Sequence, residues 1–217
     1  MERRMRFLAG LLAGVILALV LLGGSPAVGT DVAGRAQAWT ALQSSVVLVS
    51  YGGSPPRIIS AYCGGTKVAN DLVLTAFHCV RLRDDGYYVV SYANQEVPVR
   101  MKVAWRRQDA DLAILQSNEP LPGKIAPLAS DIAVGENIVL VGAPNSGYVS
   151  VPFMLTKGVI GDILTMNFSG NPFECKEPPE PFGLKDHQVI LTDASAYFGN
   201  SGGGAFNDMG QLVGVLV

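Results

Sequence analysis

The sequence predicts an all-β fold, either a sandwich or a barrel, from three observations. Short runs rich in β-branched and aromatic residues recur along the chain and are bounded by turn-forming residues. The 217 residues include 25 glycines and 13 prolines, which suit a fold of many short strands and turns. No long stretch has the apolar spacing of an amphipathic helix. With 49% hydrophobic and 16% charged residues, the chain has enough apolar material for one domain, or for two half-domains that share a core.

The expected strands follow one another with short connections. Segment 45–51 is typical, because valines dominate it and a glycine- and proline-containing turn follows. Segment 31–43 is expected to be a short linker or helical turn, and segment 119–123, which has two prolines, a linker between two halves. Segment 167–187 is polar and rich in proline, and is interpreted as a surface loop. The other expected strands are 57–62, 65–68, 72–75, 87–92, 97–104, 111–116, 137–141, 153–160, 163–168, 189–192 and 212–217.

The first 29 residues have the layout of an export signal. Three arginines within the first six residues precede an apolar run over 7–22, and small residues follow at Ala27 and Gly29 in the spacing that a signal peptidase accepts. The run is long for a cleaved signal and slightly short for a comfortable membrane span, which needs about 20 residues. Segment 1–29 is therefore expected to be either a cleaved signal peptide or a retained N-terminal membrane anchor. Under both alternatives the domain over 30–217 is exported and is periplasmic, extracellular or anchored facing outward.

The charge of the chain bears on its partners. The net charge is −2, and no long basic or acidic run follows the leader. A nucleic-acid-binding domain usually carries a clustered basic surface, so nucleic acid is not expected as the main partner.

Gly199-Asn200-Ser201-Gly202-Gly203 is the stretch that most strongly suggests chemistry. A serine hydroxyl is a weak nucleophile and needs a base to accept its proton, together with backbone N–H groups directed at the oxygen that becomes negative. Glycines on both sides of the serine allow a tight turn that directs consecutive N–H groups the same way. The alternative is a glycine-rich turn between two strands that carries a solvated serine.

Two histidines and two aspartates are candidates for the partners of Ser201. His78 follows the expected strand 72–75, whereas His187 lies in the expected loop and is interpreted as solvated. Imidazole suits a general base near neutral pH, and a carboxylate on its far nitrogen fixes the tautomer. Asp111 precedes an apolar strand and Asp109 lies two residues earlier, so either could supply that carboxylate. Each of these residues taken alone also fits a structural role.

The three cysteines divide into a pair and a single residue. Cys63 and Cys79 bracket the strands that lead to His78, and in an exported protein such a pair is expected to form a disulfide. Two free buried thiols are the alternative. Cys175 has no partner left, so it is an exposed thiol, a link to another chain, or half of a bond to sequence outside this chain.

Four motifs together resemble the trypsin/chymotrypsin clan of serine peptidases. They occur in the order of the clan and at compatible spacings: Cys63-Gly64-Gly65-Thr66, Leu74-Thr75-Ala76-Phe77-His78-Cys79, Asp111-Leu112-Ala113-Ile114-Leu115, and Gly199-Asn200-Ser201-Gly202-Gly203. Within the clan the chain is most similar to HtrA/Deg-like peptidases, through segments 134–136, 141–144, 156–160 and 192–194. The cysteine pair is closer to the animal-type enzymes.

The resemblance implies two perpendicular antiparallel β-barrels, the first over about 40–120 and the second over about 124–217, with the site between them. It implies that His78 is the base, that Asp111 rather than Asp109 orients it, and that Ser201 is the nucleophile. The N–H groups of Gly199 and Ser201 would form the oxyanion hole. The implied function is an exported serine endopeptidase that cleaves protein or peptide substrates through an acyl-enzyme, with no metal or organic cofactor.

Three departures from the clan qualify these expectations. Asn200 stands where many digestive-type members have an aspartate that pairs with a new N-terminus, so no activation of that kind is expected. Ser195 stands at the pocket-floor position that is acidic in trypsin, so the expected pocket, Ser195-Ala196-Tyr197, favours small or apolar side chains. The chain ends at Val217, where the clan continues, and the second barrel is therefore expected to be incomplete.

Two other functions remain open. A truncated or non-catalytic protease-like binding module would explain the early end of the chain. An acyl hydrolase could use the same three residues, although the strand pattern lacks the alternating helices of the α/β-hydrolases.

Overall fold

The computed structural model describes residues 32–52, 57–82, 84–145, 151–166 and 187–217. The leader over 1–29, most of the expected loop over 167–187, and Cys175 lie outside the described residues. In the described part the strands greatly outnumber the helical segments, which are one α-helix and two short 3-10 turns. The all-β prediction is confirmed.

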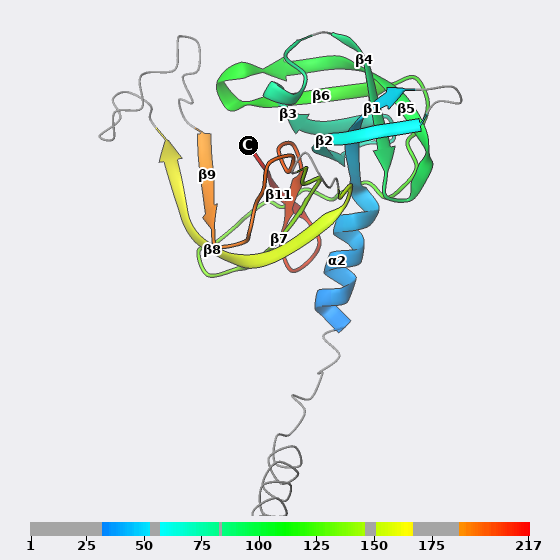
Figure 1. The fold of residues 1–217 in the computed structure, drawn as a ribbon. Coiled ribbons are helices and arrows are strands. Elements are labelled where there is room, and N and C mark those ends of the chain that lie inside the picture. The colour runs from blue at the N-terminus through cyan, green and yellow to red at the C-terminus, as the bar shows by residue number, and fades with distance from the viewer. Residues whose placement is uncertain (1–31, 53–56, 83, 146–150, 167–186) are drawn as a thin grey trace, which may run out of the picture. The chain divides into compact units, whose positions relative to one another are not determined.

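Six strands form a closed antiparallel barrel, in the order β1-β2-β3-β6-β5-β4 (Figure 1). Their bounds are β1 Ser45–Gly52, β2 Arg57–Lys67, β3 Leu72–Ala76, β4 Asp85–Ser91, β5 Asn94–Arg107 and β6 Leu112–Ser117. Along β6 every second residue is buried, which is the pattern of a strand with one face toward a core. The buried cluster of this barrel contains Val46, Leu48, Cys63, Val73, Val80, Tyr87, Val89, Met101, Ala113, Leu115 and Leu121.

The other five strands form an open, curled sheet in the order β11-β10-β7-β8-β9. Their bounds are β7 Asn137–Gly142, β8 Met154–Met166, β9 His187–Thr192, β10 Gly204–Phe206 and β11 Leu212–Val215. The central strand β7 is buried on both faces: Ile138 and Leu140 belong to one apolar cluster, and Val139 and Val141 to another. No strand pairing joins β9 to β11 among the described residues, so this half of the fold is a sheet and not a closed barrel.

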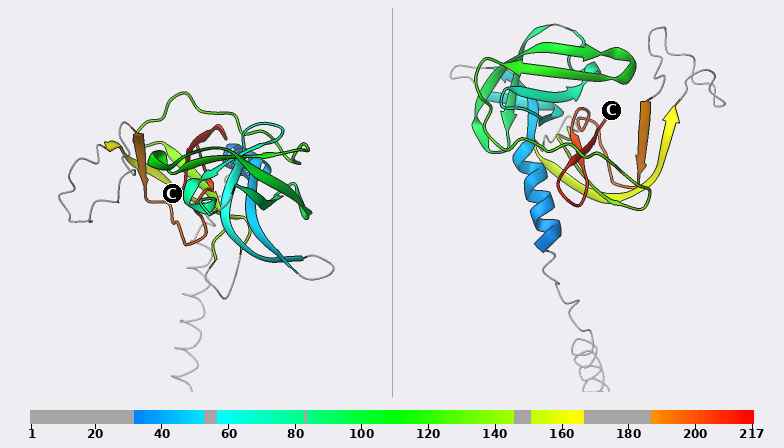
Figure 2. Two further views of the ribbon diagram at one scale, coloured as in Figure 1. Left: turned by 90° about the horizontal axis from the view of Figure 1, so that it is seen from above. Right: turned by 180° about the vertical axis from the view of Figure 1, so that it is seen from behind.

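Helix α2, Val32–Ser44, corrects the expectation of a linker or helical turn over 31–43. Figure 1 and the right view of Figure 2 show it leading directly into β1. Its last turn is anchored by Ala41, which is fully buried beside Phe206 and Leu212 of the second sheet. The Ala41 carbonyl accepts hydrogen bonds from the hydroxyls of Ser44 (3.1 Å) and Ser45 (2.7 Å), where the helix ends. The helix has no apolar stripe, which is why the sequence pattern did not reveal it.

The strand boundaries also differ from the prediction in several places. The two strands expected over 57–68 are one continuous strand, β2, and those expected over 153–168 are one strand, β8. The short strand β10 was not predicted, because three residues give no periodic signal. His187 begins β9, where its backbone pairs with Met166, and is therefore not part of a loop.

Residues 33–217 form one compact unit. The connection between the barrel and the sheet is held by Lys67, which is only 4% exposed. Its ammonium donates to the carbonyl oxygens of Leu121 (2.6 Å) and Gly123 (2.9 Å). Burial lowers the pKa of Lys67 from its usual value, since desolvation disfavours the charged form. Among the described residues, no helix has both the length and the apolar character needed to cross a membrane.

Candidate active site

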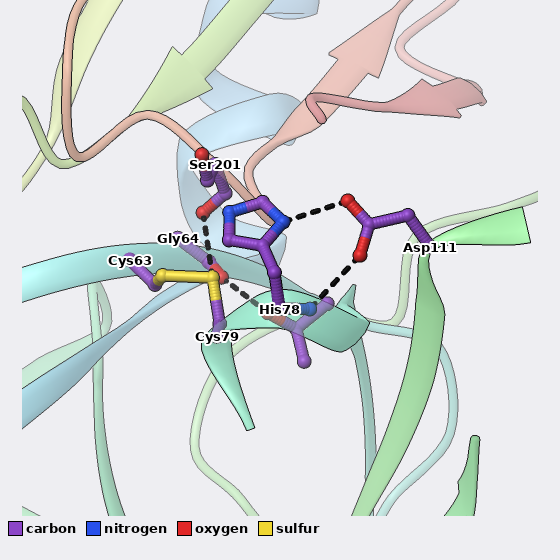
Figure 3. A network of polar contacts seen from close by, with 7 residues as sticks. Cys63, Gly64, His78, Cys79, Asp111 and Ser201 are labelled. Carbon is purple, nitrogen blue, oxygen red and sulfur yellow. Dashed lines mark hydrogen bonds and ion pairs between the residues drawn. A yellow bond between two sulfur atoms is a disulfide. The ribbon is translucent and has the colours of Figure 1, made fainter. Parts of the chain in front are cut away.

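The Asp111 carboxylate binds His78 through both of its oxygens. Oδ2 lies 2.6 Å from Nδ1 of the imidazole, and Oδ1 accepts a hydrogen bond of 2.9 Å from the backbone N–H of His78 (Figure 3). The two side chains are 40% and 24% exposed, with the imidazole the more exposed. A neutral imidazole whose Nδ1 proton is held by the carboxylate presents a lone pair at Nε2, which is the atom that a general base needs.

Neighbouring strands bring this pair together. Strand β3 leads into a 3-10 turn, Phe77–Cys79, and β6 pairs with β3 as far as Leu112 opposite Ala76. The N–H of Phe77 then donates to the Asp111 carbonyl oxygen at 2.9 Å, which extends the pairing by one step. Asp111 itself has left-handed backbone angles, φ 50° and ψ 38°, a conformation that Asp and Asn adopt more readily than other non-glycine residues. The strand pairing and this bend bring the carboxylate to His78.

Ser201 lies in the connection between β9 and β10, and its backbone is bound from the barrel. The N–H of Gly64 in β2 donates to the Ser201 carbonyl oxygen at 2.7 Å. The same oxygen lies 3.7 Å from the sulfur of Cys79, the neighbour of His78. In Figure 3 the imidazole lies between Asp111 and the loop that carries Ser201. No hydrogen bond joins the Ser201 hydroxyl to the imidazole in the described structure.

The glycine-rich loop leaves two of its N–H groups unpaired. Gly199 has φ +93°, and a side chain there would overlap the Ala143 carbonyl oxygen, so glycine is required. The N–H of Asn200 donates to the Tyr197 carbonyl oxygen at 3.0 Å. Within the described part of the chain, the N–H groups of Gly199 and Ser201 have no acceptor. Two unpaired donors flank one that is occupied, an arrangement that can bind an anionic oxygen.

Cys63 and Cys79 form the predicted disulfide, which links two residues 16 positions apart in the sequence. It joins strand β2 to the turn that carries His78. Cys63, His78 and Cys79 also form a group of metal-ligand residue types within 4.8 Å of one another. Because both sulfurs are used in the disulfide, this group lacks the thiolates that would bind a metal.

Asn200 is almost completely buried, at 3% exposure, and lies against the backbone of Gly142. Backbone hydrogen bonds hold the loop around it. The N–H of Asn145 donates to the carbonyl oxygen of Phe198 (2.8 Å), and the N–H of Gly202 donates to the carbonyl oxygen of Leu216 (2.6 Å). These contacts order the loop within the described part of the chain without an ion pair at Asn200.

The expected pocket residues Ser195, Ala196 and Tyr197 are all exposed. The Thr156 hydroxyl of β8 donates to the Ser195 carbonyl oxygen at 2.7 Å and fixes the start of this segment. Their role in substrate binding stays a prediction. His187 has its backbone in the pairing of β8 and β9.

Two residues beside Ser201 received no role from the sequence. The Gly64 backbone binds the Ser201 carbonyl oxygen, and the buried Thr75 hydroxyl donates to the Gly64 carbonyl oxygen at 2.8 Å. A polar residue inside the apolar strand Leu72–Ala76 was the available signal for Thr75. Nothing in the sequence pattern indicates the bonds of Gly64, because its backbone makes them.

Comparison with known proteins agrees with this geometry. Residues 63–215 match the family model of the trypsin-like peptidase domain. The bovine (Bos taurus) mitochondrial serine protease HTRA2 is 32% identical over 110 residues, which are 49% of this chain and 20% of the relative. Protease Do-like 1 of Arabidopsis thaliana chloroplasts is 28% identical over 150 residues, 66% of this chain and 29% of the relative. Human serine protease HTRA4 is 27% identical over 163 residues, 73% of this chain and 31% of the relative.

The chain thus spans between about a fifth and a third of the length of these curated relatives, with matches of 20%, 29% and 31% of their sequences. The family match covers well over half of the chain and includes every motif on which the resemblance was based. The chain belongs to the trypsin-like peptidase domain family and is similar to the HtrA and Do-like serine proteases within it.

Proposed function

We propose that the chain is a serine endopeptidase in which Ser201, His78 and Asp111 form a catalytic triad. The single observation that carries the proposal is the contact of both Asp111 oxygens with His78, beside the loop that holds Ser201. A solvated surface histidine has no need of a carboxylate held by two bonds. Membership of the trypsin-like peptidase family supports the same reading.

The reaction follows from these groups. Ser201 Oγ attacks the carbonyl carbon of a peptide bond, and its proton passes to Nε2 of His78. The oxygen of the tetrahedral intermediate is stabilised by the N–H groups of Gly199 and Ser201. The imidazolium returns the proton to the leaving amine nitrogen as the C–N bond breaks, which leaves the acyl-enzyme. Water then attacks the acyl carbon in the same manner, and the acid product leaves with the Ser201 hydroxyl restored.

The proposed substrates are proteins or peptides with a small or apolar side chain before the cleaved bond. Ser195, Ala196 and Tyr197 supply no acidic group for a lysine or arginine side chain. The proposed location is outside the cytosol. The disulfide supports it, because such bonds persist in oxidising compartments, and so does the export-like pattern of residues 1–29, with cleavage or membrane anchoring of that leader as the two alternatives.

Active-site labelling tests the proposal. Purified full-length chain is treated with a fluorophosphonate, and the labelled residue is identified by mass spectrometry. We expect labelling at Ser201, and a fall of about 10⁴-fold or more in its rate in His78→Ala, since serine without its base is a poor nucleophile.

His187→Ala is the matched control, because the chain has only two histidines. It is expected to react at the wild-type rate. A folded wild-type sample that stays unlabelled would favour the second candidate, a protease-like binding module. The absence of a hydrogen bond between the Ser201 hydroxyl and the imidazole in the described structure is the observation on the side of that candidate.

A further inference from the structure

Thr75 is a fully buried polar residue in the apolar strand β3, at 0% exposure. A valine would suit the position equally well as a strand residue and would need no hydrogen-bond partner. The Thr75 hydroxyl has a specific partner: it donates to the Gly64 carbonyl oxygen at 2.8 Å.

Gly64 connects Thr75 to the proposed nucleophile. Its carbonyl oxygen is held by Thr75, and its N–H donates to the Ser201 carbonyl oxygen at 2.7 Å. Thr75 lies on β3 and Gly64 on β2, whereas Ser201 comes from the connection between β9 and β10. One hydrogen bond therefore joins the closed barrel to the backbone of Ser201, and a second, within the barrel, holds the glycine that donates it.

The loop that carries Ser201 packs closely against Thr75 and Gly64, with no space for an added side chain. A Cβ on Gly202 would overlap both the Thr75 hydroxyl and the Gly64 carbonyl oxygen. A Cβ on Gly64 would lie 2.7 Å from the Cα of Gly203, closer than real Cβ contacts come. The two residues that follow Ser201 are thus packed directly onto the Thr75–Gly64 pair.

The same strand also positions the acid–base pair. Thr75 is three residues before His78 and stands opposite Ala113, two residues after Asp111. Loss of the Thr75 hydroxyl alone is therefore expected to affect Ser201 through Gly64 and to leave the His78–Asp111 pairing in place.

We infer that Thr75 is a positioning residue for Ser201, acting through Gly64. By holding the Gly64 carbonyl oxygen, its hydroxyl restricts the position of the Ser201 backbone, and with it the approach of Ser201 to His78. The inference rests on the proposed function, since it assigns Thr75 a role in placing that nucleophile.

The test compares Thr75→Val, which lacks the hydroxyl, with Thr75→Ser, which keeps it. We expect Thr75→Val to lower kcat, and the rate of fluorophosphonate labelling of Ser201, by about 10- to 100-fold, as small displacements of reacting groups do. KM and the pH at which the rate is half-maximal should not change, because the acid–base pair is intact. Thr75→Ser should stay within about threefold of wild type, since it retains the donor.

Each outcome supports the inference or overturns it. Equal rates for Thr75→Val and Thr75→Ser would overturn it and leave Thr75 a structural residue. If Thr75→Val does not fold, Thr75→Ala, which is smaller, replaces it in the comparison.

If the wild type itself is unreactive, the proposed function fails, and amide hydrogen exchange decides the inference instead. Faster exchange of the Gly64 amide in Thr75→Val than in Thr75→Ser would support the link from Thr75 to Ser201, and equal exchange would overturn it.

Discussion

The closed barrel and the open sheet hold their parts of the candidate site in different ways. His78 and Asp111 come from two adjacent strands of the barrel and bind each other directly. Ser201 comes from the connection between β9 and β10, and its carbonyl oxygen is bound by Gly64 of the barrel. The His78–Asp111 pair is therefore assembled within one sheet, whereas the position of Ser201 depends on the junction between the two halves.

The largest expected effect tests the proposed acid–base pair of the barrel, His78 and Asp111. Asp111→Asn should lower turnover by about 10⁴-fold, because the amide stabilises the wrong imidazole tautomer. Asn also tolerates the left-handed backbone of Asp111, so the fold should be retained. Steady-state kinetics with a peptide substrate measures the loss.

Asp109→Asn is the matched control and should change turnover by less than about threefold. A loss smaller than tenfold in Asp111→Asn would show that the carboxylate is not the partner that the mechanism needs.

A second change tests how tightly the barrel packs against the loop that carries Ser201. In Gly64→Ala the Cβ added to strand β2 of the barrel would lie 2.7 Å from the Cα of Gly203, a backbone atom of the loop that carries Ser201. We expect the free energy of unfolding to fall by more than about 3 kcal/mol, measured by urea denaturation.

Gly161→Ala in β8 is the control for the junction. Its nearest new neighbour is the Leu191 carbonyl oxygen at 3.7 Å, an ordinary contact, so its effect should stay within about 1 kcal/mol. Equal losses in the two variants would mean that the junction is no more tightly packed than the exposed sheet.

Removal of the disulfide tests the barrel separately from the sheet. The double variant Cys63→Ala/Cys79→Ala should lose about 3 kcal/mol of stability in the chain-entropy model, given the separation of 16 residues. Hydrogen exchange should speed up in β2 and β3 while β8 and β9 keep their wild-type rates. Uniform acceleration in all four strands would show that the two halves unfold as one unit.

The smallest expected effect is a pH dependence of stability caused by Lys67, which holds the connection between the barrel and the sheet. Burial lowers the pKa of Lys67, so between that lowered value and 10.5 the unfolded chain binds more protons than the folded one. Stability should therefore rise with pH across this window, at no more than about 1.4 kcal/mol per pH unit for one group. Thermal unfolding between pH 8 and 10.5 measures the slope, and Lys67→Met should flatten it. An unchanged slope in Lys67→Met would assign the pH dependence to other groups.

Much of the fold was visible in the sequence, because several strands are runs rich in β-branched residues, as in β1, or alternate in burial, as in β6. Strand β6 alternates strictly, and its expected bounds differ from the observed ones by one residue. Helix α2 was missed because it has no apolar stripe: its end is anchored by one small residue, Ala41, and by two serine hydroxyls. Short or locally anchored elements depend on tertiary contacts that no local pattern records.

The features of the candidate site also differ in whether the sequence could predict them. Side chains with characteristic chemistry and spacing, such as His78 and the Cys63–Cys79 pair, could be identified from the sequence. The left-handed bend at Asp111 and the backbone bond from Gly64 to Ser201 could not, because they arise from strand register and the packing of the two halves.

The ring contacts of Trp39 make its intrinsic fluorescence a probe of the fold. Trp39 of helix α2 lies edge-on to Tyr92, with ring centroids 6.0 Å apart, and Tyr92 lies edge-on to Phe153 of the sheet half at 5.3 Å. The other tryptophan, Trp105, lies on strand β5 opposite Ile114 of the barrel. The fluorescence of Trp39 should therefore follow the docking of the helix, and that of Trp105 the integrity of the barrel.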